Sequence, residues 1–296
     1  MFKKKKYDFI IIQGWNDINY IISLFIGKYF GSKIILRSEA NSQKKINKLK
    51  FFFKNFFLKL IFSKINYFAA IGSLNKKFYL KNGVKKNNIF MMPYCVDNNF
   101  FRKIDAKYMY FLKKKYAIKK QDKIILFAGK LIPRKSPITL LKAFSLLKKK
   151  NVHLIFVGDG ILKTSLHEIV LQKKIKRVYF FGFLGQKKLS TIYNMSDIFV
   201  LVSKEETWGL VVNEALAGSC AVIVSKQVGS SIDLVKNNYN GFVLNKINEF
   251  SLNNYLNKLL SSKKLSQIKK NSRKSITRFS IKENIKNLNS IFKNGR

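Results

Sequence analysis

Two carboxylates, Glu206 and Glu214, stand with seven residues between them in the stretch SKEETWGLVVNEALAGSCAVIVS. The pattern predicts a strand that ends before them, a turn at Gly209 and an amphipathic helix that holds Glu214. Glu214 then lies about 8 Å along the helix axis from Gly209. A helix leaves its first amides unbonded, so those of Gly209, Leu210 and Val211 can hold a phosphate. The predicted site therefore has a carboxylate, then a phosphate site, then a second carboxylate. A nucleoside diphosphate that carries a sugar has its parts in a matching order, with the diphosphate between the sugar and the nucleoside.

A second segment, FAGKLIPRKSP, gathers positive charge where another predicted strand ends. Gly129 is followed by Lys130, Arg134 and Lys135. Glycine lets a ligand approach the backbone closely, and two or three cations can neutralise a diphosphate. Lysines are abundant throughout this chain, so the charge alone is more typical of a solvated loop. The position favours a ligand site, because open α/β sheets bind ligands at the carboxyl ends of their strands.

Both segments need a scaffold of parallel strands. Strand-like runs alternate with helical patterns and are apolar throughout, which is typical of sheets covered on both faces. We therefore expect an α/β protein with two Rossmann-type, doubly wound parallel-sheet domains, the first of them incomplete. The expected domains are 1–105, 106–279 and a C-terminal helix at 280–296. The expected strands are 7–12, 33–36, 67–71, 123–128, 152–157, 178–181, 198–202, 221–224 and 242–244.

The second domain resembles the donor-binding domain of the retaining glycosyltransferases of family 4, which have the two-domain GT-B fold. FAGKLIPRK resembles the glycine-and-basic loop of that family, and FVGDG resembles its second strand and turn. FFGFLGQKKLSTIYNMSDIFVLVS matches the next segment, and the two glutamates match the Glu-x7-Glu motif. The order is collinear from the first of these segments to the last. The resemblance implies a sugar transferase that uses a nucleotide-diphosphate sugar and no metal.

The resemblance also implies roles for single residues. Glu206, Lys135 and Lys130 would be catalytic, with Glu206 on the donor sugar and the lysines on the diphosphate. Lys130 stands where arginine is commoner in the family, which keeps the charge but loses the bidentate fork. Taken singly, Glu214 is also typical of a helix surface, and Glu206 of a helix start. The implied donor-binding residues are Gly129, Arg134, Gly182, Phe183, Leu184, Thr207, Trp208, Gly209, Leu210, Val211 and Glu214, the last on the ribose hydroxyls.

The first domain resembles the later part of the family's acceptor domain. Ser38 and Glu39 follow a strand end where the family keeps polar residues that line the cleft, often a histidine. They are equally typical of a turn and a helix cap. The family's opening strand and glycine-rich loop have no counterpart here, so we expect a shortened acceptor domain. One alternative function is a remnant that binds nucleotide sugars but needs a partner chain for activity, and a weaker one, from the charge alone, is a basic nucleic-acid-binding protein.

The formal net charge is +43, from 58 Lys and Arg against 15 Asp and Glu. Residues 44–64 predict a basic amphipathic helix, with Phe53, Phe56 and Phe57 interleaved by lysines. Such a helix suits an anionic membrane surface, or packs its phenylalanines on its own domain. A glycan or lipid-linked acceptor of the cell envelope fits the first of these. No nucleic acid is expected as a partner, because no zinc-finger, RNP or helix-turn-helix pattern is visible.

The remaining composition excludes several classes of protein. Two cysteines cannot build a disulfide framework, and two histidines are too few for a His-rich zinc site. No apolar run approaches the ~20 residues that span a bilayer. The start, MFKKKKYDFIII, has too short an apolar stretch for a signal peptide, so it predicts a strand. We expect a cytoplasmic protein, peripheral at the inner face of the membrane.

Overall fold

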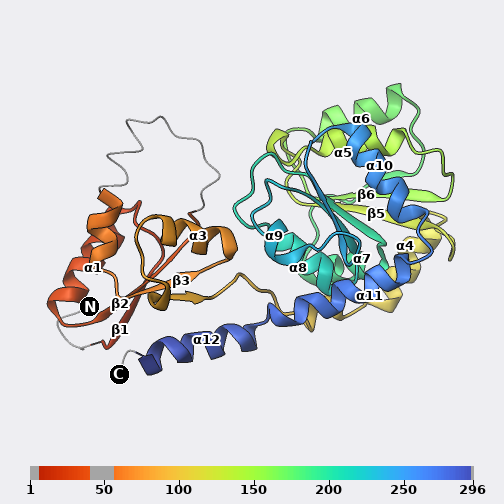
Figure 1. Ribbon diagram of the computed structural model, residues 1–296. Helices are drawn as coiled ribbons and strands as arrows, with labels where there is room; N and C mark the ends of the chain where they lie inside the picture. The colour runs from red at the N-terminus through yellow and green to blue at the C-terminus, as the bar shows by residue number, and fades with distance from the viewer. Residues whose placement is uncertain (1–6, 41–56, 295–296) are drawn as a thin grey trace. The chain divides into compact units, whose positions relative to one another are not determined.

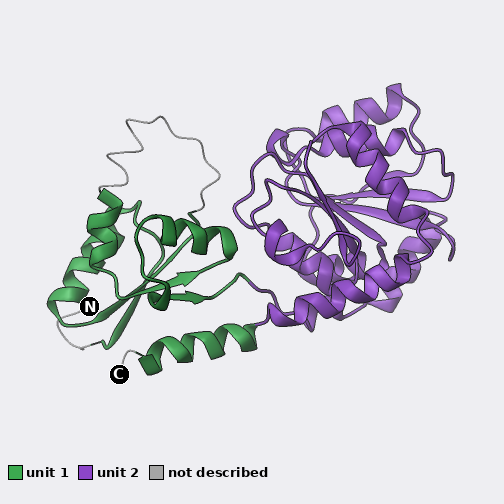
Figure 2. Cartoon of the chain, viewed as in Figure 1, with its two compact units in different colours: residues 1–94, 281–296 green, residues 95–280 purple. Residues whose placement is uncertain are grey.

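The computed structural model describes residues 7–40 and 57–294. The chain divides into two compact units, of which unit 1 holds 1–94 and 281–296, and unit 2 holds 95–280 (Figure 2). The sequence predicted a boundary after residue 105 and a separate final helix. The boundary instead lies after Tyr94, and the final helix belongs to unit 1 because it packs on the sheet of that unit.

Unit 1 has a four-stranded parallel sheet in the order β1-β2-β3-β4. The sequence patterns missed β4, a strand of three residues with one buried side chain, although β7 is as short and was predicted. The strands are β1 (Phe9–Ile12), β2 (Lys33–Ser38), β3 (Tyr67–Ala70) and β4 (Ile89–Met91). The helices are α1 (Ile18–Tyr29), α3 (Ser73–Lys81), η1 (Lys86–Asn88) and α12 (Ile281–Asn294), and residues 57–63 are also helical.

The two faces of this sheet have different cover. Successive side chains of a strand point to opposite faces, so Ile34 and Leu36 of β2 enter one core and Ile35 enters the other. The first core is closed by α1, the helix at 57–63 and α3. The second is closed by α12, through Ile291. Figure 1 shows α1 and α3 on one side of the sheet and α12 on the other.

Unit 2 has a six-stranded parallel sheet in the order β10-β9-β8-β5-β6-β7, which confirms the doubly wound α/β architecture. The order reverses between β5 and β8, and such a switch point is where open sheets bind ligands. The strands are β5 (Lys123–Ala128), β6 (Val152–Val157), β7 (Val178–Phe180), β8 (Ile198–Leu201), β9 (Ala221–Ser225) and β10 (Gly241–Leu244). The helices are η2 (Phe100–Arg102), α4 (Ala106–Lys115), η3 (Pro133–Lys135), α5 (Pro137–Ser145), α6 (Lys163–Gln172), α7 (Gln186–Met195), α8 (Leu210–Ala217), α9 (Ser231–Leu234), α10 (Glu249–Leu260), α11 (Leu265–Ser275) and η4 (Ile276–Arg278).

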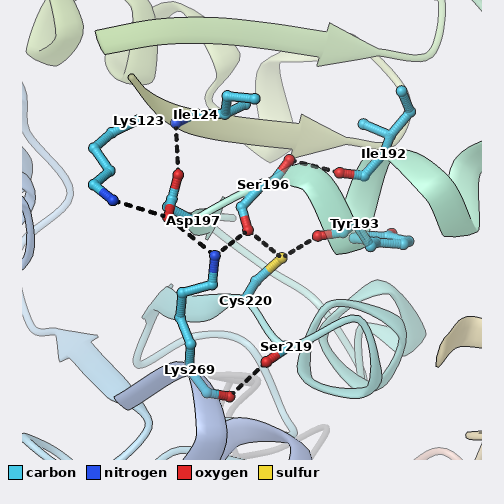
Figure 3. Close-up of polar contacts among 9 residues, drawn as sticks. All are labelled: Lys123, Ile124, Ile192, Tyr193, Ser196, Asp197, Ser219, Cys220 and Lys269. Carbon is cyan, nitrogen blue, oxygen red and sulfur yellow. Dashed lines mark hydrogen bonds and ion pairs between the residues drawn. The ribbon is translucent and has the colours of Figure 1, made fainter. Parts of the chain in front are cut away.

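The amino ends of β5 and β8 are tied to α11 by one carboxylate, that of Asp197 (Figure 3). Its Oδ2 accepts a hydrogen bond from the Ile124 amide at 3.0 Å, and its Oδ1 accepts one from Lys269 Nζ at 3.0 Å. Lys269 Nζ also donates to the Ser196 carbonyl at 3.1 Å. Beside this cluster, burial raises the pKa of the Cys220 thiol to about 12, so it stays an unreactive thiol. This end of the sheet is a structural anchor.

We expect Asp197→Ala to lower the free energy of unfolding by about 2–3 kcal/mol, because it removes the acceptor of a backbone amide and leaves Lys269 without its counter-charge. Urea denaturation measures the change. Asp159→Ala is the matched control. It removes an exposed carboxylate paired with Lys163 and should change stability by less than about 0.5 kcal/mol. Equal effects of the two substitutions would contradict the anchoring role.

Most of the predicted basic helix at 44–64 lies outside the described residues. In its described part, Leu58, Ile61 and Phe62 are buried in unit 1, and Phe57 and Leu60 are about half exposed. One face of this helix therefore packs on its own unit. Among the described residues, none of the helices is both long and apolar enough to span a membrane.

Candidate functional site

Two predicted loops meet at the carboxyl edge of the unit 2 sheet. We call residues 129–136, after β5, the basic loop and residues 202–209, after β8, the acidic loop. They follow β5 and β8, which are neighbours, although the two sides of the contact lie 71 residues apart in the chain. Lys135 Nζ donates to Glu206 Oε2 at 2.7 Å, and both side chains are nearly buried, at 12% and 15% exposed. Arg134 Nη1 donates to the Glu205 carbonyl at 2.6 Å and lies 3.7 Å from Glu206 Oε2. Two cations therefore converge on one carboxylate.

Gly129 lies beside this ion pair, in a backbone conformation that favours glycine. It has a φ of +147°, and a Cβ there would lie 3.5 Å from Lys135 Cδ. Lys130, the next residue, is exposed. Ser136 follows Lys135 in a left-handed conformation and is buried before the first turn of α5. The loop thus presents one inward cation, Lys135, and two more exposed ones, Lys130 and Arg134.

Helix α8 begins directly after the acidic loop. Gly209 precedes it with a φ of +88°, a conformation that glycine adopts without strain, and its carbonyl accepts from the Val212 amide at 2.9 Å. The amides of Gly209, Leu210 and Val211 belong to the end of α8 that the helix does not bond internally. Leu210 is 41% exposed and Val211 is half-buried, so solvent reaches this end of the helix, whereas Gly209 is buried. This end can hold an anion beside Lys135 and Arg134.

Glu214 is held by a residue that the sequence analysis did not single out. The hydroxyl of the fully buried Tyr193, on α7, donates to Glu214 Oε2 at 2.8 Å. Burial raises the pKa of Glu214, and the hydrogen bond from Tyr193 opposes that rise. Burial and the neighbouring carboxylate hold the pKa of Tyr193 well above its ordinary value, so this phenol stays a donor. Tyr193 thereby fixes one oxygen of Glu214 and leaves the other for a ligand.

The acidic loop rests on residues 227–230, which the sequence analysis also missed. The Glu206 amide donates to the Gln227 carbonyl at 3.3 Å, and the Gly229 amide donates to the Glu206 carbonyl at 2.8 Å. A Cβ on Gly229 would overlap the carbonyl oxygen of Thr207. A glycine after β9 was the available sequence signal, but its role depends on which loop packs against it.

The side chain of Trp208 lies in the interior, and Gly209 beside it is buried as well. Trp208 is 4% exposed, and its indole N–H donates to Asn213 Oδ1 at 2.9 Å. The side chain of Trp208 therefore cannot reach a bound nucleotide sugar. Any contact of this residue with the nucleotide sugar would come from its main chain. Thr207, beside it, is half-buried.

The predicted base-binding loop lies at the same edge, after β7. Gly182 has a φ of +63°, Phe183 is 86% exposed and Leu184 is half-buried. The Gly182 carbonyl accepts from the Gly158 amide at 2.7 Å. A Cβ on Gly158 would overlap the carbonyl oxygen of Gly129. The loops after β5, β6 and β7 thus touch through their backbones, which leaves backbone groups and Phe183 at the surface.

In unit 1, the two predicted acceptor-side residues behave differently. Ser38 is buried, and its Oγ shares a hydrogen bond of 2.8 Å with the hydroxyl of Tyr79, so it belongs to the interior. Glu39 Oε1 accepts from the Tyr94 hydroxyl at 2.6 Å, and the Arg37 guanidinium lies 4.6 Å from the centre of the Tyr94 ring. Burial and Glu39 raise the pKa of Tyr94 to about 12. Glu39 alone of the pair lies in a polar cluster.

The chain resembles known proteins of one kind. The family model described as "Glycosyl transferases group 1" matches residues 110–275. The uncharacterized glycosyltransferase MJ1069 of Methanocaldococcus jannaschii is 28% identical over 254 residues, which are 83% of this chain and 63% of the relative. The alpha-monoglucosyldiacylglycerol synthase of Acholeplasma laidlawii is 31% identical over 142 residues, 47% of this chain and 35% of that protein.

A solved structure shares the fold. Anabaena Alr3699/HepE in complex with UDP has a TM-score of 0.80 and 16% identity, and the likeness covers 97% of this chain and 79% of that one. The chain spans between about a third and just under two thirds of the length of the two curated relatives.

Proposed function

This chain belongs to the family described as glycosyl transferases group 1, and from that premise we propose that it moves a hexose from a nucleotide-diphosphate sugar to a glycan or lipid-linked acceptor, with retention. The proposal places it in family 4 of the glycosyltransferases. The contact that carries it is the ion pair between Lys135 and Glu206, which joins a phosphate-binding cation to a sugar-binding carboxylate.

In this proposal, binding of the nucleotide sugar separates Lys135 from Glu206, and each side chain then contacts a different part of the nucleotide sugar. The diphosphate takes Lys135, Arg134 and the first amides of α8, and Glu206 turns to the sugar hydroxyls. The bond between the sugar C1 and the phosphate oxygen breaks, and the acceptor oxygen bonds to C1 on the same face. The leaving phosphate oxygen takes the acceptor proton. Cations and helix amides stabilise the charge that develops on the diphosphate, without a resident metal.

The nucleoside would lie on the far side of the diphosphate. Glu214, fixed by Tyr193 at 2.8 Å, accepts hydrogen bonds from the ribose hydroxyls. The backbone of Gly182, Phe183 and Leu184 frames the base. HepE was solved with UDP, so UDP is the first nucleotide to test.

The acceptor proposal rests on charge and on one relative. A chain of net charge +43 is attracted to anionic lipid surfaces. One curated relative is named as an alpha-monoglucosyldiacylglycerol synthase, an enzyme whose product name is that of a lipid. We propose that the protein works in the cytoplasm, peripheral at the inner face of the membrane, on an acceptor of the cell envelope.

Calorimetric titration with UDP, GDP and ADP tests the donor site. In ~0.3 M salt, which screens nonspecific attraction, we expect one nucleotide to bind in the micromolar range. Glu214→Ala should weaken that binding about 10- to 100-fold, because the ribose loses its acceptor. Glu168→Ala, which removes an exposed carboxylate from α6, is the control and should have no effect. Binding that ignores both the base and the Glu214 substitution would refute the assigned site.

A further inference from the structure

The hydroxyl of Tyr193 has a single contact in the part of the chain that the structure describes. Its side chain is fully buried on α7, with the ring edge-on to Phe101 and Phe199 at centroid distances of 6.1 and 5.9 Å. The hydroxyl makes one hydrogen bond there, the donation of 2.8 Å to Glu214 Oε2. A phenylalanine would fill the same space without a polar atom to satisfy. The hydroxyl therefore gives Glu214 a contact that packing of the core does not require.

Close packing of α7 against α8 holds this contact in place. Gly218 caps the carboxyl end of α8, and its amide donates to the Glu214 carbonyl at 2.8 Å. A Cβ on Gly218 would overlap the Cβ of Tyr193, so a larger residue would push the two helices apart. The Cys220 thiol also donates to the Tyr193 carbonyl at 3.1 Å (Figure 3). Packing around both residues therefore sets the distance from the phenol to Glu214.

Burial and Tyr193 together determine the charge state of Glu214. The elements that pack most closely on α8 are α7, α11, η2, η4, β8 and β9. Their titratable and charged groups, together with the thiol before β9, are Tyr193, Cys220, Lys187, Lys188, Lys269, Lys270, Lys274, Arg102, Arg273 and Arg278. Of these groups, only the Tyr193 hydroxyl acts on the pKa of Glu214, which it lowers against the rise that burial causes.

The cations among these groups have other partners or lie in solvent. Lys269 contacts Asp197, and Arg273 Nη2 donates to Asn194 Oδ1 at 3.1 Å. Arg102 Nη2 donates to the Arg273 carbonyl at 3.3 Å. The remaining cations are exposed, namely Lys187, Lys188, Lys270, Lys274 and Arg278. Without the phenol, Glu214 would be a partly buried carboxylate with no hydrogen bond from the described residues, and that setting favours its protonated form.

We propose that Tyr193 is a positioning residue for nucleoside recognition, which orients Glu214 toward the ribose, holds it as a carboxylate and so sets the pH below which nucleotides bind weakly. The inference rests on the proposed function, which assigns the ribose hydroxyls to Glu214. Because Oε2 accepts from Tyr193, a proton added to Glu214 would sit on the other oxygen and turn the ribose acceptor into a donor. Acid therefore weakens nucleotide binding, and loss of the phenol moves that weakening to higher pH.

Two measurements on Tyr193→Phe in the full chain test the proposal. The first is an NMR titration of isotope-labelled glutamate carboxyls, with the Glu214 signal assigned from Glu214→Gln. Glu214 should titrate about half a pH unit or more above its wild-type midpoint. The second is calorimetry with UDP, GDP and ADP in ~0.3 M salt. The variant should bind the preferred nucleotide about tenfold more weakly than the wild type near about pH 6, and nearly as tightly near about pH 9.

Two controls accompany this variant. Inorganic diphosphate carries no ribose, so the wild type and Tyr193→Phe should bind it equally at each pH. Tyr255→Phe removes a hydroxyl of α10 that has no hydrogen bond within the described residues, and it should behave as the wild type in both measurements. Urea denaturation checks that each variant still unfolds cooperatively.

Three results would overturn the proposal. An unchanged titration of Glu214 in Tyr193→Phe would show that the phenol does not hold the carboxylate. Nucleotide affinity that keeps the wild-type pH dependence, or a loss of affinity for diphosphate as well, would make Tyr193 a purely structural residue. A wild type that binds none of the nucleotides refutes the donor site and this inference with it, whereas the first two results refute the inference alone.

Discussion

Replacing Glu206 by alanine is expected to reduce turnover of the nucleotide sugar by about 1,000-fold, because the proposed mechanism gives this carboxylate the donor sugar. The protein should still unfold cooperatively, since Glu206 is held to residues 227–229 through its backbone rather than its side chain. The loss should appear in kcat more than in nucleotide affinity, because the diphosphate and ribose contacts stay. Release of the sugar to acceptor or water, followed with a radiolabelled donor, measures it.

Glu205→Ala is the matched control for this substitution. Glu205 is the neighbouring carboxylate, exposed to solvent, and it binds Arg134 through its carbonyl oxygen, which the substitution keeps. Turnover should therefore change less than about threefold. Undiminished turnover in the Glu206 variant would remove Glu206 from the mechanism. Absence of turnover in the wild type, with nucleotide binding intact, would favour a protein that binds nucleotide sugars without transferring the sugar.

Replacing Gly229 by alanine is expected to displace the acidic loop, and with it Glu206, from the donor site. The new Cβ would overlap the Thr207 carbonyl, so the acidic loop and residues 227–230 must move apart. That movement weakens the hydrogen bond of 2.8 Å from the Gly229 amide to the Glu206 carbonyl. We expect a loss of about 2–3 kcal/mol in the free energy of unfolding, as overpacking typically causes. Nucleotide-sugar turnover should fall at least tenfold, because Glu206 is displaced.

Gly185→Ala provides the control. A Cβ on Gly185 would meet nothing within 4 Å, and its backbone is extended at a φ of −65°, so alanine fits without strain. Its stability should stay within about 0.5 kcal/mol of the wild type. Urea denaturation and donor turnover compare the two variants. If Gly229→Ala were as stable and active as Gly185→Ala, the loop after β9 would have no part in positioning Glu206.

The sequence alone predicted the doubly wound α/β fold and nine of the strands. Those strands lie in runs of mostly apolar residues, and the strand that was missed, β4, is as short as the predicted β7, at three residues. The sequence also predicted the segments that hold Glu206, Glu214 and the basic loop, because carboxylates, glycines and cations at fixed spacings are local properties of a chain. The side chains that these residues contact lie far from them in the sequence.

Only the tertiary structure decided those partners. Lys135 and Glu206 lie 71 residues apart, and they meet because β5 and β8 are neighbours in a strand order that no spacing specifies. The same order places Tyr193 on Glu214, and packing buries Trp208 and Ser38, two residues that the resemblance had placed in the donor and acceptor sites. Residue type and short-range periodicity determine which elements form and what chemistry they carry. Which elements pack together depends on burying every apolar face at once, and that choice fixes which side chains meet.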